Sequence, residues 1–120
     1  MSPLTNCIKN NDTRTNPVWL MRQAGRYLPE FREIRKKNTD FIKLCLNSDL
    51  ASEITLQPIQ RFGVDGAVIF SDILMLPYGL GQKVEFEKNF GPKLGEIELD
   101  KIKNVDEINF IQNSNKMRKI

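Results

Sequence analysis

The segment AVIFSD, at residues 67–72, is the clearest indication of the fold class. Its apolar residues follow one another without alternation, which is typical of a strand covered on both faces in a parallel sheet. The run ends at Asp72, whose carboxylate is unfavourable to bury unless a partner satisfies it. Just upstream, GVDG at residues 63–66 predicts a turn that leads from a helix into the strand. We therefore predict a buried strand of an α/β fold with a polar group at its carboxyl end.

A second apolar run lies nearer the N-terminus, where PVWLM at residues 17–21 also suits a buried strand. The segments between and after the two runs carry helix caps, prolines and turn residues. We expect three helices: residues 29–37 beginning at Pro29, residues 41–46 capped by Thr39 or Asp40, and residues 48–62 capped by Ser48 and kinked at Pro58. After the second apolar run we expect a loop at 77–81, a hairpin strand at 83–87 and a turn at 89–92. A last helix is expected to begin at Asn104 or Asp106.

The order of these elements is strand, helices, strand, hairpin and helix, which predicts the opening of an α/β fold. A closed (β/α)8 barrel typically needs about 250 residues, and this chain has 120. We therefore predict the N-terminal part of a (β/α)8 TIM barrel, incomplete in this chain. Residues 1–16 are expected to form a polar N-terminal lead-in, and residues 17–120 the first βα units.

Composition excludes several classes of function. The chain contains no histidine, which removes Ser-His catalysis and histidine metal ligands from it. Its formal net charge of +3 is far from that of a dedicated nucleic-acid binder, and its longest apolar run is too short to span a bilayer. Cys7 and Cys45 lie far apart and without metal-ligand spacing, so we expect free thiols in a reducing compartment. We predict a cytoplasmic protein that binds neither membrane nor nucleic acid.

Two groups of residues carry candidate chemistry. RQAGR at residues 22–26 places Arg22 and Arg26 directly after the first predicted strand, with Gln23, Ala24 and Gly25 between them. Paired guanidiniums beside small residues suit a ligand with several carboxylates or phosphates. The alternative is a pair of surface arginines in loose ion pairs with Glu30 or Glu33.

Asp72 is the second candidate, and its alternative role is that of a turn or cap residue. The carboxyl ends of barrel strands gather at one face, so the arginines and Asp72 are expected to line one polar pocket.

Several segments resemble the uroporphyrinogen decarboxylase family. PVWLMRQAGRYLPEF at residues 17–31 is very similar to the N-terminal signature of these enzymes. Further similar segments follow in the family's order, at residues 56–58, 61–65, 69–74 and 90–92. A run of this length is a specific signal, and the resemblance covers residues 16–94.

The resemblance implies a (β/α)8 barrel that acts as a homodimer and needs no cofactor and no metal. It implies removal of carbon dioxide from the four acetate side chains of uroporphyrinogen III, giving coproporphyrinogen III on the route to haem. Arg22 and Arg26, with Gln23, Gly25 and the Ala24 backbone, would hold substrate carboxylates. Asp72 would accept hydrogen bonds from the pyrrole N–H groups at the centre of the ring, and Arg22 and Asp72 are the candidate catalytic residues.

The chain also departs from the family. The tyrosine, the serine or threonine and the histidine of the family's site lie downstream of residue 120, which puts the activity of this piece alone in doubt. One alternative is a truncated, non-catalytic remnant that binds a polyanionic tetrapyrrole. Another is a small basic nucleic-acid-binding module, which is disfavoured because basic and aromatic residues do not alternate.

Overall fold

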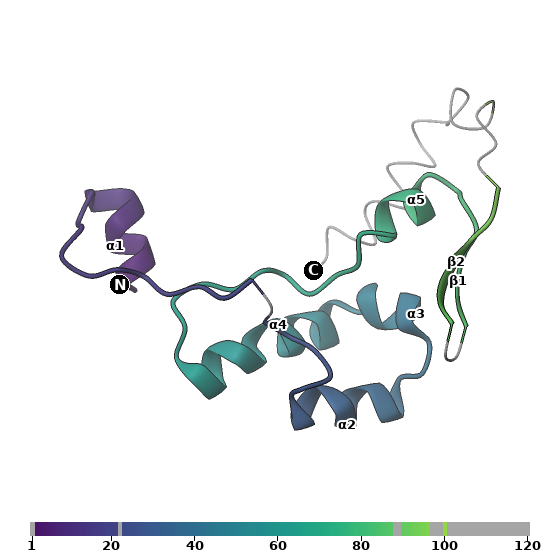
Figure 1. Cartoon of the computed structure of the whole chain (residues 1–120), viewed down its shortest axis with the longest axis horizontal. Coiled ribbons are helices and arrows are strands. Elements are labelled where there is room, and N and C mark those ends of the chain that lie inside the picture. The colour runs from purple at the N-terminus through teal and green to yellow at the C-terminus, as the bar shows by residue number, and fades with distance from the viewer. Residues whose placement is uncertain (1, 22, 88–89, 97–99, 101–120) are drawn as a thin grey trace.

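The computed structural model describes residues 2–21, 23–87, 90–96 and 100. The elements follow one another from a separate N-terminal helix, through a group of three helices, to a short helix and a hairpin (Figure 1). In chain order they are α1 (Pro3–Asn10), α2 (Pro29–Lys37), α3 (Phe41–Cys45), α4 (Ser48–Phe62), α5 (Met75–Gly79), β1 (Val84–Glu87) and β2 (Gly91–Leu94).

Local chemistry sets the ends of helices α2 to α4. Pro29 occupies the first turn of α2, as predicted, where its missing N–H costs no hydrogen bond. The Asp40 side chain caps α3 by accepting the Lys43 N–H at 3.1 Å. The prediction that Ser48 caps α4 is wrong, because the cap is Asn47, whose side chain accepts the Leu50 N–H at 3.0 Å. Helix α4 ends at Phe62 and is capped by Gly63, which adopts the left-handed conformation with φ of 66°.

The core lies between these three helices. Its members are almost completely buried apolar side chains: Leu28, Phe31, Ile34, Leu44 and Ile54. The half-buried ring of Phe70 packs against them from the extended segment that precedes Asp72. The ring of Phe86 on β1 reaches Phe41, with 4.8 Å between the centroids, and so joins the hairpin to the same core.

The two predicted buried strands are corrected by the structure. Residues 17–21 and 67–70 are extended, but neither is part of a β-ladder in the described part of the chain. The sheet there is instead the antiparallel pair β1–β2, with Val84 opposite Leu94. Trp19 is 51% exposed and Ile69 is 59% exposed. Burial on both faces requires a covering layer on each side, and helices α2–α4 lie on one side of these segments (Figure 1).

Other predictions had mixed outcomes. The prediction of a loop at 77–81 is wrong, because helix α5 occupies much of that range. The predicted hairpin strand at 83–87 is confirmed as β1. The polar lead-in at residues 1–16 contains helix α1, capped by the Ser2 hydroxyl, which accepts the Thr5 N–H at 3.2 Å. The last predicted helix lies outside the described residues, and the kink at Pro58 stays a prediction.

Helix α1 meets the extended segments at Gly66. A Cβ atom placed on Gly66 would lie 3.2 Å from Leu4 Cδ2 and 3.6 Å from Trp19 Cδ1. Glycine therefore allows the side chains of Leu4 and Trp19 to approach the backbone closely at this point.

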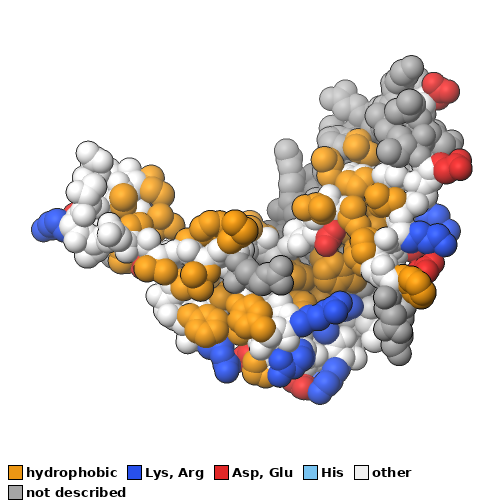
Figure 2. Space-filling view, in the orientation of Figure 1, with side chains coloured by type: hydrophobic (Ala, Val, Ile, Leu, Met, Phe, Trp, Pro, Cys, Tyr) orange, Lys and Arg blue, Asp and Glu red, His pale blue; other side chains and the backbone are white. Residues whose placement is uncertain are grey.

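The structure is open, with a radius of gyration of 17.5 Å, whereas a compact chain of this length would have about 14 Å. Hydrophobic side chains are spread along the extended middle of the face in Figure 2, above a lower edge rich in lysine and arginine. Met21 and Ile73 are 87% and 89% exposed. No helix of the described residues combines the length and apolar character that a membrane crossing requires.

Candidate functional site

The loop that follows the first extended segment is closed by its own hydrogen bonds. The Leu28 N–H donates to the Gly25 carbonyl at 3.0 Å, which forms a turn. The Tyr27 hydroxyl donates to the Gln23 carbonyl. From helix α2, Arg32 Nη1 donates to the Arg26 carbonyl at 2.9 Å. The backbone that carries Arg26 is therefore held from several sides.

The guanidinium of Arg26 is exposed and makes no hydrogen bond or ion pair within the described residues. The other arginines of that part of the chain all have partners. Arg14 binds Asp12, Arg32 and Arg35 donate to backbone carbonyls, and Arg61 pairs with Glu30. Arg26 therefore keeps its full donor capacity for a ligand.

The alternative in which Arg26 pairs with Glu30 or Glu33 is not what the structure shows. Glu30 of α2 pairs with Arg61 of α4. Glu33 pairs with Lys36 at 2.6 Å, and this hydrogen bond lowers the pKa of Glu33. Both carboxylates are therefore engaged elsewhere, and for Arg26 that alternative is wrong. Arg22 lies outside the described residues.

The three residues between the two arginines differ in their surroundings. Gln23 is only 6% exposed, and its side-chain amide is bound on both sides by the backbone of the second extended segment. Its Nε2 donates to the Gly66 carbonyl at 3.0 Å, and its Oε1 accepts the Val68 N–H at 2.8 Å. Ala24 is half-buried against the helical core, and Gly25 is half-buried in the turn.

Asp72 is half-buried just before α5. Its Oδ1 accepts the Leu74 N–H at 2.9 Å, and its carbonyl accepts the Met75 N–H at 3.0 Å. The predicted turn role of Asp72 is therefore confirmed, and it uses one carboxylate oxygen. The Oδ2 atom has no hydrogen bond among the described residues, so it can accept one from a ligand.

The charge of Asp72 also acts on a buried thiol. Burial raises the pKa of Cys45 to about 11, the nearby Asp72 carboxylate adds to this rise, and Arg35 opposes it. The carboxylate of Asp72 therefore lies within electrostatic range of Cys45 on helix α3.

The structure brings the two site segments together but does not bring all their side chains into contact. Gln23 joins the loop of residues 23–28, which carries Arg26 and is called the arginine loop below, to the segment that leads to Asp72. No hydrogen bond or ion pair joins Arg26 to Asp72 within the described ranges.

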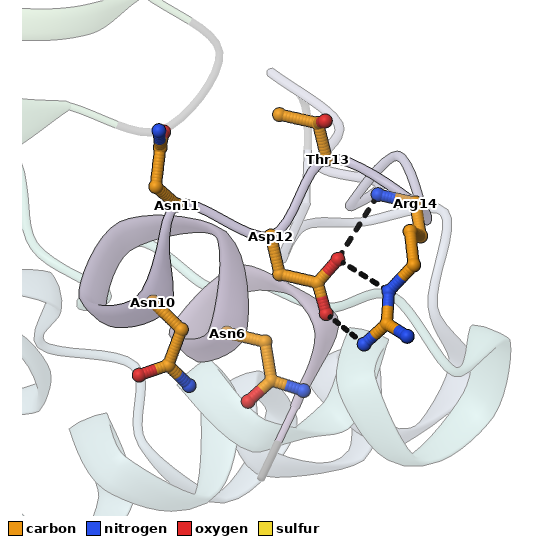
Figure 3. A pocket seen from close by; sticks show the side chains of 6 residues that line it. All are labelled: Asn6, Asn10, Asn11, Asp12, Thr13 and Arg14. Atoms are coloured by element: carbon orange, nitrogen blue, oxygen red, sulfur yellow. Dashed lines mark hydrogen bonds and ion pairs between the residues drawn. The ribbon is translucent and has the colours of Figure 1, made fainter.

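A hollow elsewhere contains none of the predicted site residues. It has a volume of about 500 Å³ and is lined by Asn6, Asn10, Asn11, Asp12, Thr13 and Arg14 (Figure 3). Asp12 and Arg14 point toward one another and form an ion pair at 2.7 Å. The hydrogen bond from the Arg14 side chain lowers the pKa of Asp12, and its charge is therefore already satisfied. In the part of the chain that the structure describes, acidic and cysteine side chains do not gather in a group that could hold a metal ion.

Sequence reasoning missed two residues that support the site. Asp65 binds the backbone of Val18, 47 positions away, and Thr55 binds the backbone of Phe70, 15 positions away. No local pattern marks either residue, because each partner lies in a different element.

Comparison with known proteins places the whole chain beside one family. The family model described as "Uroporphyrinogen decarboxylase (URO-D)" matches residues 1–120. A uroporphyrinogen decarboxylase of Chelativorans sp. (strain BNC1) is 56% identical over 90 residues, which make up 75% of this chain and 26% of that protein. The corresponding protein of Brucella anthropi is 57% identical over 86 residues, 72% of this chain and 25% of the relative. That of Acidiphilium cryptum is 60% identical over 82 residues, 68% of this chain and 23% of the relative. The chain thus spans about a quarter of the length of these relatives.

Proposed function

This chain belongs to the uroporphyrinogen decarboxylase family, and we propose that it supplies the carboxylate-binding loop and the central aspartate of a decarboxylase in porphyrin biosynthesis. The proposed reaction removes carbon dioxide from the four acetate side chains of uroporphyrinogen III and yields coproporphyrinogen III. The family implies a TIM barrel, and we propose that this chain forms its opening units. The proposal includes a cytoplasmic homodimer that works without a cofactor or metal.

The observation that carries the proposal is the unpaired guanidinium of Arg26 on a loop held by hydrogen bonds. An arginine without a protein partner can grip a carboxylate through two parallel, charge-assisted bonds. The loop's backbone is fixed by Arg32 and by the Gly25–Leu28 turn, so little ordering is needed when a ligand binds.

We assign the substrate carboxylates to Arg22 and Arg26, with the backbone of Ala24 and Gly25. Gln23 belongs to the same loop, but its amide is bound by the backbone of Gly66 and Val68. Asp72 faces the pyrrole N–H groups, and its free Oδ2 accepts a hydrogen bond from the ring. Loss of carbon dioxide breaks the bond between the acetate methylene and its carboxyl carbon. The electron pair left behind flows into a pyrrole ring that has first been protonated. A second proton turns the methylene into a methyl group, and the ring then returns the first proton to its donor, so that each acetate takes up one proton in all.

In this scheme the ionised Asp72 stabilises the cationic, protonated ring by a charge fixed in advance. Arg22 is the candidate proton donor for the ring. Guanidinium is a weak acid, so this role requires that the bound substrate excludes water from Arg22.

The proposal is tested by binding of uroporphyrin, the oxidised form of the substrate with its eight carboxylates, to the 120-residue chain, measured by equilibrium dialysis. Replacing Arg26 by Gln removes a charge-assisted pair, and we expect affinity to fall about tenfold. Arg61→Gln is the matched control, because it removes the same charge from a surface ion pair with Glu30. Equal losses in both variants would show that uroporphyrin responds only to net charge, and the proposal would fail.

Detection of a product distinguishes the decarboxylase from the alternative function, in which the chain binds a tetrapyrrole without converting it. Incubation of the chain with uroporphyrinogen, followed by chromatography of the oxidised products, reports turnover. Because the chain spans about a quarter of its relatives, binding without turnover would assign it the role of a non-catalytic tetrapyrrole-binding piece.

A further inference from the structure

Two extended segments of the site lie side by side and are joined by side chains instead of a β-ladder. They run from residue 17 to the arginine loop and from residue 64 to Asp72, and Figure 1 shows them together between α1 and α5. Gln23 binds the second segment with both ends of its amide, at the Gly66 carbonyl and the Val68 N–H. The amide takes the place that a peptide group of a neighbouring strand would fill. We call this pair of bonds the glutamine clamp.

A second attachment lies further toward the N-terminus. The Val18 N–H donates to Asp65 Oδ2 at 2.9 Å, and the Asp65 N–H donates to the Val18 carbonyl at 2.8 Å. Residues along an extended chain rise by about 3.3 Å each. A slip of one residue would therefore break the bonds at both attachments, which makes the register between the segments specific.

The glutamine clamp is also connected to the site on either side. The Gln23 carbonyl accepts the Tyr27 hydroxyl and so closes the arginine loop. Beyond Val68, the Phe70 N–H donates to the Thr55 hydroxyl of α4 at 2.8 Å, and Asp72 follows two residues later. One side chain thus stands between the loop that presents Arg26 and the segment that presents Asp72.

We propose that Gln23 is a positioning residue whose amide sets the register between the arginine loop and the Asp72 segment, and thereby the spacing of the cationic and anionic ends of the ligand site. The inference rests on the proposed function of that site. Gln23 acts through the backbone of Gly66 and Val68, and its amide is buried against them.

The bond itself is tested by amide hydrogen exchange on the 120-residue chain. In Gln23→Leu the Val68 N–H loses its acceptor, and we expect its exchange to accelerate at least about tenfold. The Phe70 N–H, held by Thr55, is expected to keep its rate. Thr55→Val is the matched control and should reverse the pattern. Unchanged exchange at Val68 in Gln23→Leu would overturn the inference.

If Gln23→Leu does not fold, Gln23→Glu is the second variant, because protonation of its carboxyl group can restore both hydrogen bonds of the clamp. A protonated carboxyl group offers one donor and one acceptor, as the amide does, whereas a carboxylate offers acceptors alone. The carboxylate therefore keeps an acceptor for the Val68 N–H but loses the donor to the Gly66 carbonyl. We expect urea unfolding to show Gln23→Glu close to wild type in stability at about pH 4 and less stable than wild type at about pH 7. A stability difference that stays constant with pH would contradict the clamp.

Uroporphyrin binding separates this inference from the proposed function. If Gln23 positions the site, Gln23→Leu lowers affinity at least about threefold although Arg26 is intact. Weakened binding in Arg26→Gln with unchanged binding in Gln23→Leu would remove the positioning role and leave the proposed function standing. Unchanged binding in Arg26→Gln would remove both.

Discussion

The ring of Phe70 meets the ring of Phe31 edge-on, with 5.7 Å between the centroids and 64° between the ring planes. Phe41 meets Phe70 in the same manner, at 6.0 Å and 86°. Edge-on contacts of this kind contribute beyond the apolar area that they bury. Phe70 therefore fastens the segment that leads to Asp72 onto helices α2 and α3.

Replacing Phe70 by Ala is expected to destabilise the chain by roughly 2–3 kcal/mol, less than the ~3–5 kcal/mol of a fully buried phenylalanine, because Phe70 is half-buried. The measurement is urea unfolding followed by circular dichroism. Phe90 is the control, since it is 87% exposed and its removal should change little. Equal effects of Phe70→Ala and Phe90→Ala would contradict the packing of Phe70 between Phe31 and Phe41.

Gly63 is required by backbone conformation and not by space. Its φ is 66°, and a Cβ atom there would meet nothing within 4 Å. Gly63→Ala should therefore cost about 1 kcal/mol through backbone strain alone. A Cβ atom on Gly79 would likewise meet nothing within 4 Å, but Gly79 lacks the positive φ, so Gly79→Ala should be neutral or slightly stabilising. Urea midpoints that fall equally in both variants would count against this account.

Cys45 should make stability fall at alkaline pH. Its pKa rises on folding from the ordinary 9.0 to about 11, chiefly because the thiol is buried. Between these values the unfolded chain has lost the proton and the folded chain still holds it, so the contribution is complete below pH 9 and is lost as pH rises toward 11. We expect a loss of roughly 2 kcal/mol.

The test compares urea unfolding of wild type and Cys45→Ala at several pH values. Lysine and tyrosine titrations are common to both proteins, so their difference isolates the thiol. The free energy of unfolding of wild type should fall relative to that of Cys45→Ala as the pH rises from 9 toward 11. Parallel curves would show that Cys45 ionises equally well in the folded and unfolded chain.

Local signals in the sequence were sufficient to predict helices α2, α3 and α4, but not α1 or α5. Pro29 and Asp40 mark helix starts by chemistry that acts within a few residues. The error at Ser48 was one residue, because Asn47 beside it is an equally good cap. The loop at 77–81 was mispredicted because proline and glycine both favour turns, and a single helical turn can still include them.

The strands were harder, because burial depends on what covers a segment. The apolar run at residues 67–70 has the composition of a fully covered strand, but Val68 and Ile69 are both 59% exposed in the described structure. Asp72 and Arg26 stand out by charge and position. The roles of Gln23 and Asp65 depend on partners more than 40 positions away, and a single sequence contains no signal for such pairs.

The close approach at Gly66 also gives the protein an optical reporter. Trp19 is the sole tryptophan of the chain, and its indole lies against Gly66, where Leu4 of α1 also arrives. The emission of an indole shifts to longer wavelength as its exposure to water increases. Intrinsic fluorescence therefore reports whether α1 and the two extended segments stay together. A red shift in a variant with intact helices would reveal their separation without any added label.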